Sequence, residues 1–289
     1  MLIIENEIIK AAFKSTGAEL RSLVKKESNL EYIWQADPNY WSKSSPILFP
    51  IVGALKDDIF KHNNKEYLLP RHGFAREKEF LVENHSKSKI TFLLTEDSET
   101  LKIFPFEFQL RICYELLENS LKVIYTVNNN GLDTLFFSIG GHPAFNCPLD
   151  KSLSYEDYYL EFNQKEDLVC WPITKEGLIK NYSEPLNNKT NTLSLNKALF
   201  FGDALVFKDL LSEKITLKTK KNNTKLEFYF KKFPFFGIWA AKNADFVCLE
   251  PWCGIADSEK SNHNIEDKEG IIKLSPNDVF DKEFEIKVF

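Results

Sequence analysis

The sequence lacks several patterns that mark large enzyme classes. Its 289 residues include only 11 glycines, and these form no Gly-x-Gly-x-x-Gly, no Walker loop and no Gly-x-Ser-x-Gly elbow. The zinc-protease pattern His-Glu-x-x-His is also missing. Because glycine-rich loops cradle phosphates and paired histidines hold catalytic zinc, these absences disfavour nucleotide-dependent and zinc-protease chemistry.

Cysteine pairs, targeting signals and long apolar runs are missing as well. The five cysteines are odd in number and show no Cys-x-x-Cys spacing, so they fit a reduced compartment better than disulfides or a metal site. The N-terminus turns acidic at Glu5, before a signal-peptide core forms. No stretch approaches the ~20 apolar residues that span a bilayer. We therefore expect a soluble cytoplasmic protein with no membrane partner.

A basic patch or tail is not present either. The chain carries 37 basic and 42 acidic residues, which gives a formal net charge of -5. Nothing in this balance complements a phosphate backbone, so nucleic acid is not an expected partner. The chain is instead rich in phenylalanine, with 25 residues, which favours packed sheet over phosphate-binding α/β loops.

Alternation of apolar and polar residues with period two dominates the chain. Apolar side chains occupy every even position of 106–116, and after a short polar turn the alternation resumes at 121–127. Two such runs joined by a short turn predict a β-hairpin. Similar runs occur near 2–13, 79–83, 89–95, 214–219, 225–231, 245–249 and 283–289.

Helical patterns are short and no linker divides the chain. Residues 97–100 and 193–200 each predict a helical turn or two, and the polar, irregular residues 172–192 predict a long loop. Nothing resembles the long amphipathic helices of βαβ units. The expected fold is all-β, a large antiparallel β-sandwich, in a single domain over residues 1–289.

Three loop-like segments interrupt the strand pattern. The first, residues 69–76, places His72 between Arg71 and Arg76, with a proline and a glycine close by. Functional residues concentrate on loops that a rigid scaffold holds. The alternative is a solvated turn whose arginines pair with Glu77 and Glu79.

The second segment, residues 137–146, carries His142 after two glycines and before a proline. Glycine permits close backbone approach, and Pro143 favours an extended conformation at His142. Because residues 134–149 are uncharged, we expect the segment to be buried or to line a pocket. A buried neutral histidine needs partners for its ring nitrogens, and the alternative to a functional role is bonding to backbone carbonyls.

The third segment, residues 244–257, places Glu250 at the end of an apolar strand and before a Pro-Trp pair. Desolvation there would raise the pKa of the carboxyl group, as a general base acting near neutral pH requires. The alternative is a strand-end glutamate that points into water.

Aromatic residues stand beside these segments. They are Trp41, Trp239, Trp252, Phe74 and Phe145. Sugar C–H faces stack on aromatic rings, which favours a carbohydrate cleft with Trp239 among its binding residues, although most of these rings are expected in the core. The residues alone thus indicate an all-β enzyme or binding protein with a His/His/Glu pocket.

In this order and spacing, the segments resemble the aldose 1-epimerase (galactose mutarotase) superfamily, most closely its LacX-type branch of galactose-mutarotase-like proteins. The resemblance runs nearly end to end and includes residues 17–20, 40–41, 46–53, 71–76, 138–146, 203–207, 236–239 and 249–252. It implies a β-supersandwich whose concave face binds an aldose, with no metal and no organic cofactor.

The resemblance also implies residue roles. Glu250 matches the general base, His142 the general acid and His72 a second histidine near the ring oxygen. Asp203 matches a carboxylate that holds sugar hydroxyls, and Arg76 a basic contact of hexose-6-phosphate epimerases. An ionised glutamate and a protonated histidine would open the sugar ring, rotate it and close it again.

Two departures from the family pattern bear on the substrate. Arg71 stands where glutamine is frequent, and Ala54 where arginine is common. Arg71, Arg76 and Lys43 could face a phosphate or pair with local acids. We expect an isomerase acting on a small-molecule sugar, an aldohexose or a hexose phosphate, as a monomer or homodimer. The preferred activity is aldose 1-epimerisation of a hexose; hexose-6-phosphate 1-epimerisation and non-catalytic carbohydrate binding are the alternatives.

Overall fold

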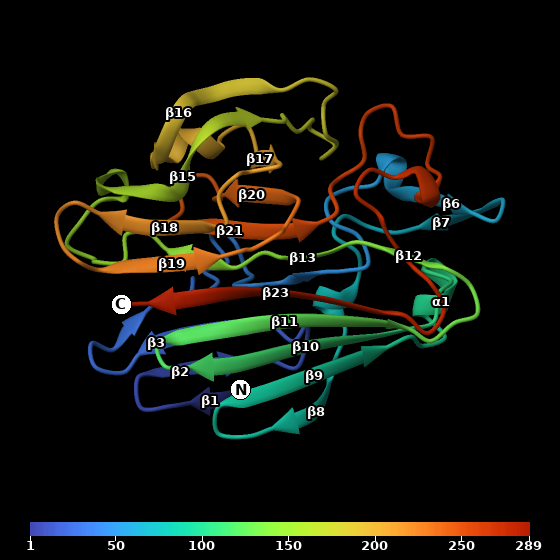
Figure 1. The fold of residues 1–289 in the computed structure, drawn as a ribbon, viewed down its shortest axis with the longest axis horizontal. Helices are drawn as coiled ribbons and strands as arrows, with labels where there is room; N and C mark the ends of the chain where they lie inside the picture. Colours follow the sequence, from blue (N-terminus) through green and yellow to red (C-terminus); the bar gives the residue numbers. More distant parts are fainter.

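The computed structural model describes residues 1–289 and consists mainly of antiparallel β-sheets (Figure 1). The all-β prediction is therefore confirmed. The α-helix is α1 (Thr100–Ile103), and single 3₁₀ turns occupy Lys56–Asp58, Ala75–Glu77, Tyr155–Asp157, Lys197–Phe200 and Ile265–Asp267. No helix combines the length and apolar composition that a membrane crossing requires.

The largest sheet has nine strands in the order β16-β15-β18-β19-β23-β11-β10-β9-β8. They are β8 (Leu81–His85), β9 (Lys89–Thr95), β10 (Phe108–Leu117), β11 (Ser120–Asn129), β15 (Tyr158–Cys170), β16 (Glu184–Ser194), β18 (Lys214–Thr219), β19 (Lys225–Tyr229) and β23 (Val279–Val288). Side chains along β10 alternate between buried and half-buried, because one face of the sheet packs inward. β10 and β11 pair from Phe108 opposite Asn129 to Leu117 opposite Ser120, which confirms the predicted hairpin.

A second sheet, called the pocket sheet below, has the order β17-β20-β21-β13-β5, and β14 also pairs with β21. Its strands are β5 (Ile47–Leu48), β13 (Ile139–Gly141), β14 (Ala144–Asn146), β17 (Leu205–Lys208), β20 (Phe235–Trp239) and β21 (Phe246–Cys253). All eight residues of β21 are buried, since both faces of this strand are covered.

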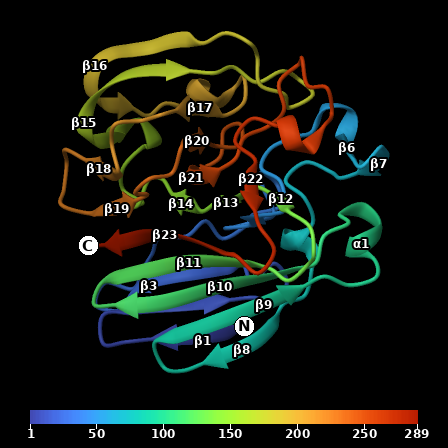
Figure 2. The ribbon, with the colours of Figure 1, turned by 45° about the vertical axis from the view of Figure 1, so that its right-hand side comes forward.

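Three smaller sheets complete the fold. A four-stranded sheet contains β1 (Leu2–Glu5), β2 (Ile9–Phe13), β3 (Leu20–Lys25) and β4 (Leu30–Glu31), and two-stranded sheets pair β6 (Ile59–His62) with β7 (Lys65–Leu68) and β12 (Leu135–Phe137) with β22 (Ile272–Leu274). The four-stranded sheet lies beside β8 to β10 (Figure 2). The Phe13 ring of β2 packs there, 4.5 Å from Tyr114 and 6.1 Å from Phe92 between ring centroids.

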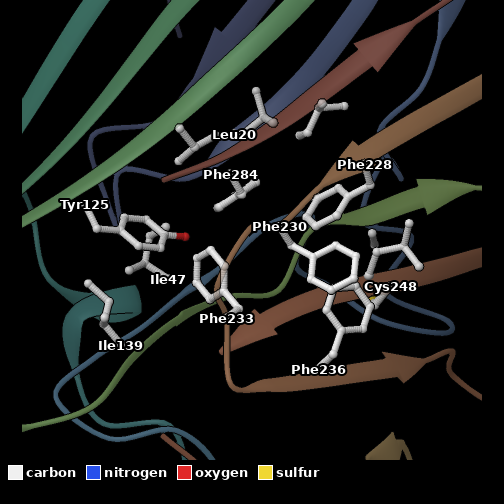
Figure 3. Close-up of a cluster of buried hydrophobic side chains, with 14 of the residues drawn as sticks. Leu20, Ile47, Tyr125, Ile139, Phe228, Phe230, Phe233, Phe236, Cys248 and Phe284 are labelled. Carbon is white, nitrogen blue, oxygen red and sulfur yellow. The ribbon is translucent and has the colours of Figure 1, made fainter. Parts of the chain in front are cut away.

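A core rich in phenylalanine joins the nine-stranded sheet to the pocket sheet (Figure 3). Phe228 and Phe284 of the nine-stranded sheet stack at 5.2 Å, and Phe236 of the pocket sheet lies 4.3 Å from Phe230. This packing holds the pocket sheet in place. The single domain over residues 1–289 stays a prediction.

One predicted loop is shorter than expected. The polar stretch 172–192 contains β16 from Glu184 onward, which pairs with β15 across several register shifts. β16 is an edge strand with most side chains exposed, so it carries no apolar alternation that the sequence could reveal. Residues 193–200, predicted as helical turns, contain the end of β16 and a single 3₁₀ turn at Lys197–Phe200.

Candidate active site

A cavity of about 260 Å³ opens over the pocket sheet. It is smaller than pockets for drug-sized ligands, roughly 300–1,000 Å³, and suits a monosaccharide better than a longer glycan. It is lined by Trp41, Gly53, Arg71, His72, Arg76, His142, Ile173, Gly177, Ile179, Asp203, Ala204, Val206, Trp239, Glu250, Trp252 and Ala256. All seven site residues predicted from the sequence therefore lie on the walls of one cavity.

Glu250 and His142 form a close, buried pair at the base of this cavity. Glu250 lies within β21, which continues through Pro251 and Trp252, so the prediction of a strand-end glutamate was wrong. Glu250 is 1% exposed, which excludes the alternative in which its side chain points into water. His142 lies between β13 and β14, and its Nε2 is 3.3 Å from Oε2 of Glu250.

Aromatic rings surround His142 on several sides. Trp41 stacks on the imidazole at 4.9 Å between centroids and 29° between planes, and Trp239 meets it edge-on at 5.6 Å. Phe246 backs both indoles, at 5.6 Å from Trp41 and 5.7 Å from Trp239. The Nδ1 atom of His142 has no hydrogen-bond partner, so the alternative of a histidine bonded to backbone carbonyls does not hold for the ring. Ring packing and the contact with Glu250 orient this imidazole.

Burial moves the two pKa values of the pair in opposite directions. It raises the pKa of Glu250 well above its ordinary value, an effect that Arg71 opposes and Asp203 reinforces. It lowers the pKa of His142 to about 3. Burial therefore favours the neutral pair, with its one proton on Glu250. This differs from the ionised glutamate and protonated histidine expected from the sequence, because desolvation penalises both charges.

The backbone fixes the tautomer of His72. This residue adopts a left-handed conformation with φ 66°, and its N–H donates to the carbonyl of Gly53 at 2.8 Å. The N–H of Gly53 donates in return to Nδ1 of His72 at 3.1 Å. Burial, His142 and Arg71 lower the pKa of His72 well below its usual range. A neutral ring whose Nδ1 accepts must carry its proton on Nε2, so His72 is a hydrogen-bond donor there.

Arg71, Arg76 and Asp203 bring charge to the cavity wall. A guanidinium nitrogen of Arg71 lies 3.7 Å from Oδ1 of Asp203, beyond hydrogen-bonding distance. Arg76 donates from Nη2 to the carbonyl of Arg71 at 2.8 Å, while its buried Nε has no partner and lies 3.9 Å from Glu77. The solvated-turn alternative holds only in part, because both arginines line the cavity and, of the expected pairs, only the long contact of Arg76 with Glu77 is present.

Other expectations divide between cavity and core. Trp41, Trp239 and Trp252 line the cavity, whereas Phe74 and Phe145 belong to the buried core. Lys43 does not line the cavity, since its Nζ pairs with Glu77 at 2.8 Å. Sequence reasoning missed one wall, which consists of Gly53, Ala256, Ile173, Gly177, Ile179, Ala204 and Val206. Small and aliphatic residues of this kind carry no chemical signal that separates them from ordinary packing.

One group of buried side chains has the composition of a metal site. Potential ligand atoms of His142, Cys248 and Glu250 lie within 4.8 Å of one another. Cys248 does not line the cavity, and burial, with the charge of Glu250, raises the pKa of its thiol well above the ordinary value. Because the thiolate is the metal ligand, a thiol held protonated in this way is poorly suited to bind metal.

Comparison with known proteins agrees with this site. The sequence profile of the aldose 1-epimerase family matches residues 1–269. The chain is 35% identical to the chromosomal protein LacX of Lactococcus lactis subsp. lactis over 294 residues, covering 99% of this chain and 98% of that protein.

Solved structures are similar over the same length. A galactose mutarotase related enzyme from Lactobacillus acidophilus superposes with a TM-score of 0.95 at 36% identity, covering 99% of this chain and 96% of that one. A galactose mutarotase-like protein from Lactobacillus casei superposes with a TM-score of 0.94 at 32% identity, covering 100% of both chains. The chain therefore belongs to the aldose 1-epimerase family and is a mutarotase-type isomerase that binds a sugar.

Proposed function

We propose that the protein interconverts the α and β anomers of an unphosphorylated aldohexose, with Glu250 and His142 as its acid/base pair. The observation that carries this proposal is the contact of 3.3 Å between the two groups, both buried in a cavity of monosaccharide size. Each proton transfer by a positioned side chain contributes roughly 10²–10⁴-fold to the rate.

The reaction transfers one proton in each direction. With the pair in its ionised form, Glu250 takes the proton of the anomeric hydroxyl and the imidazolium of His142 protonates the ring oxygen. The C1–O5 bond breaks and C1 becomes an aldehyde carbon. Rotation about C1–C2 presents the other face of the aldehyde, and reversal of both transfers closes the ring.

The proton count explains why a neutral resting pair is compatible with this chemistry. Ring opening converts the ionised pair into the neutral pair, which is the state that burial favours. Burial thus stabilises the open-chain half of the cycle relative to the closed-ring half. Bound sugar must then favour the ionised pair, which differs from the neutral pair only in the position of one proton.

The remaining polar residues have roles in binding the ring. The Nε2–H of His72, whose ring lies 6.0 Å from that of His142 between centroids, donates to a sugar oxygen near the acid/base pair. Asp203 accepts hydrogen bonds from sugar hydroxyls, and Trp239 offers an apolar ring face to sugar C–H groups. Because Asp203 and Arg71 are not hydrogen-bonded to each other, both can bind substrate without breaking a bond.

The two arginines favour a second candidate, epimerisation of a hexose phosphate. Arg71 and Arg76 both line the cavity and have free donors, and guanidinium groups bind phosphate oxygens in bidentate fashion. We keep the neutral hexose as the first proposal, because Asp203 also faces Arg71 and would repel a phosphate there.

The test follows mutarotation by polarimetry of freshly dissolved α-D-glucose and α-D-galactose, and by NMR of glucose 6-phosphate. Faster equilibration of a neutral sugar supports the first proposal, and acceleration of the phosphate alone supports the second. The matched control is Glu250→Gln, which keeps the shape of the side chain and removes the base. If the wild type equilibrates none of the three sugars faster than buffer but still binds one of them, the protein is a non-catalytic carbohydrate-binding member of the family.

A further inference from the structure

Trp252 lies flat on the pocket sheet beside Glu250. The two residues are two apart in β21 and both line the cavity. Gly140 of β13 pairs directly with Trp252, and Gly237 of β20 pairs with Glu250. The indole therefore extends across the sheet on the side where the general base stands.

Two glycines make this position of the indole possible. A Cβ atom on Gly140 would lie 2.6 Å from Cδ1 of Trp252, and one on Gly237 would lie 2.6 Å from Cη2 and Cζ2. Contacts this short overlap, so any larger residue at either site would displace the ring. Glycine at these two positions thus leaves room for the indole of Trp252.

The indole N–H of Trp252 is an unused donor. It is buried and makes no hydrogen bond of ordinary geometry, although it lies close enough to the carboxyl group of Glu250 to oppose the rise in the pKa of that group. A buried donor without a partner destabilises the folded protein. Such a cost is reduced when a nearby group gains negative charge and becomes a stronger acceptor.

We propose that Trp252 is a positioning residue whose indole N–H donates a hydrogen bond to Glu250 when that side chain becomes a carboxylate. The proposal rests on the proposed function, in which Glu250 must be ionised before it removes the anomeric proton. Burial dominates the raised pKa of Glu250, and the indole N–H is among the groups that oppose it. Trp252 thus favours the ionised pair that the reaction requires.

The other charged or titratable groups around Glu250 are His142, Arg71, Asp203 and Cys248. Arg71 stabilises the carboxylate and Asp203 destabilises it, whereas the protonated thiol of Cys248 is neutral. Replacing the N–H of Trp252 alters none of these four groups chemically. A change in the titration of Glu250 in such a variant therefore reports the indole itself.

The pH profile gives this role a signature. Between the titrations of His142 and Glu250 the pair holds one proton, and the active ionised form is a constant fraction of that state. Removing a hydrogen bond to the carboxylate raises the pKa of Glu250. The ionised fraction then falls, so the plateau of kcat/KM drops, while the alkaline limb moves to higher pH.

The first experiment compares Trp252→Phe with the wild type in anomer exchange measured by NMR across pH. We expect a plateau about tenfold lower, an alkaline limb about one pH unit higher and a KM changed less than twofold. Trp171→Phe is the matched control, since Trp171 packs against the same apolar cluster as Trp252 but does not line the cavity. It should leave the profile unchanged. A folded Trp252→Phe enzyme with an unmoved alkaline limb would overturn the proposal.

The second experiment needs no substitution at Trp252. The chain has five tryptophans, so protein labelled with ¹⁵N at the indole gives five N–H signals to follow with pH. One signal should move downfield with the midpoint of the alkaline limb, and its titration should vanish in Glu250→Gln. If no indole signal titrates although Glu250→Gln is inactive, this inference fails while the proposed function stands. If Glu250→Gln is fully active, the proposed function fails instead.

Discussion

The nine-stranded sheet and the pocket sheet differ in how they bury their side chains. In β10 the side chains alternate between the core and a partly solvated face, as in an ordinary one-sided sheet. In β21 all eight residues are buried, and they include a carboxyl group with a strongly raised pKa. The first sheet is arranged for stability, while the second keeps polar groups in an environment that penalises them.

The hydrogen bonds of the two sheets differ in the same sense. On the nine-stranded sheet, Arg111 donates to Glu83 through Nε and Nη2, at 2.8 Å for the shortest contacts. In the pocket, by contrast, buried donors or acceptors of Trp252, His142 and Arg76 have no partner. Unpaired buried groups are costly, and these three leave the cavity able to bind a polar ligand, although others, such as the hydroxyl of Tyr125 on β11, lie in the core.

The largest effect on activity is expected from a substitution at Glu250, which should not destabilise the protein. Glu250→Gln should lower kcat/KM by roughly 10²–10⁴-fold, because the amide cannot accept the anomeric proton. The raised pKa of Glu250 means that the folded protein retains a proton which the unfolded chain releases above about pH 4.3. The buried carboxyl group of Glu250 therefore makes the folded protein less stable as the pH rises, until the pH exceeds the pKa of Glu250 in the folded state.

Melting temperatures across pH check this point. The melting temperatures of Glu250→Gln and the wild type should agree near pH 4, and the variant should melt at the higher temperature toward pH 8. If the variant instead melts below the wild type at pH 8, Glu250 is not a neutral buried carboxyl group.

The reverse separation is expected in the nine-stranded sheet. Ile112 of β10 is fully buried, and Ile112→Ala should destabilise the protein by about 2–5 kcal/mol through lost burial and a cavity. Chemical denaturation measures this loss, and kcat/KM of the folded variant should match the wild type within twofold. A large fall in kcat/KM without loss of stability would show that the two regions are not separate in function.

Sequence patterns predicted the first region better than the second. The alternation in 106–127 reveals the β10–β11 hairpin because each strand has one buried and one wetter face. The edge strand β16 has no buried face, so no alternation in the sequence predicts it. The family resemblance located His142 and Glu250, but their protonation state depends on desolvation, which only coordinates reveal. The roles of Gly140 and Gly237 likewise depend on strand register rather than on any local motif.

A smaller effect is expected at His72. His72→Asn tolerates the left-handed backbone, since asparagine adopts it readily, but removes the Nε2–H donor. One lost hydrogen bond to the sugar should lower kcat/KM about tenfold, with little change in melting temperature. The pH at which activity falls should not shift, because His72 is neutral throughout the range. A shifted profile would instead make His72 an acid or base of the reaction.

The smallest effect is expected at the surface of the nine-stranded sheet. Arg111 and Glu83 form a partly exposed pair, and Arg111→Ala should cost about 0.2–1 kcal/mol of stability. The loss should shrink in high salt because solvent ions screen the pair. Denaturant titrations at low and high salt measure it, and an effect of several kcal/mol would show that this sheet too depends on its polar contacts.

The central claim is that His142 and Glu250 share one proton across neutral pH. The most direct measurement is kcat/KM for anomer exchange of α-D-galactose or α-D-glucose, whichever reacts, as a function of pH. We predict that kcat/KM does not fall as the pH drops through about 6.5, the ordinary histidine pKa, because burial lowers the pKa of His142 to about 3. An acid limb with its midpoint near pH 6.5, as an imidazole of ordinary pKa would give, would contradict the account.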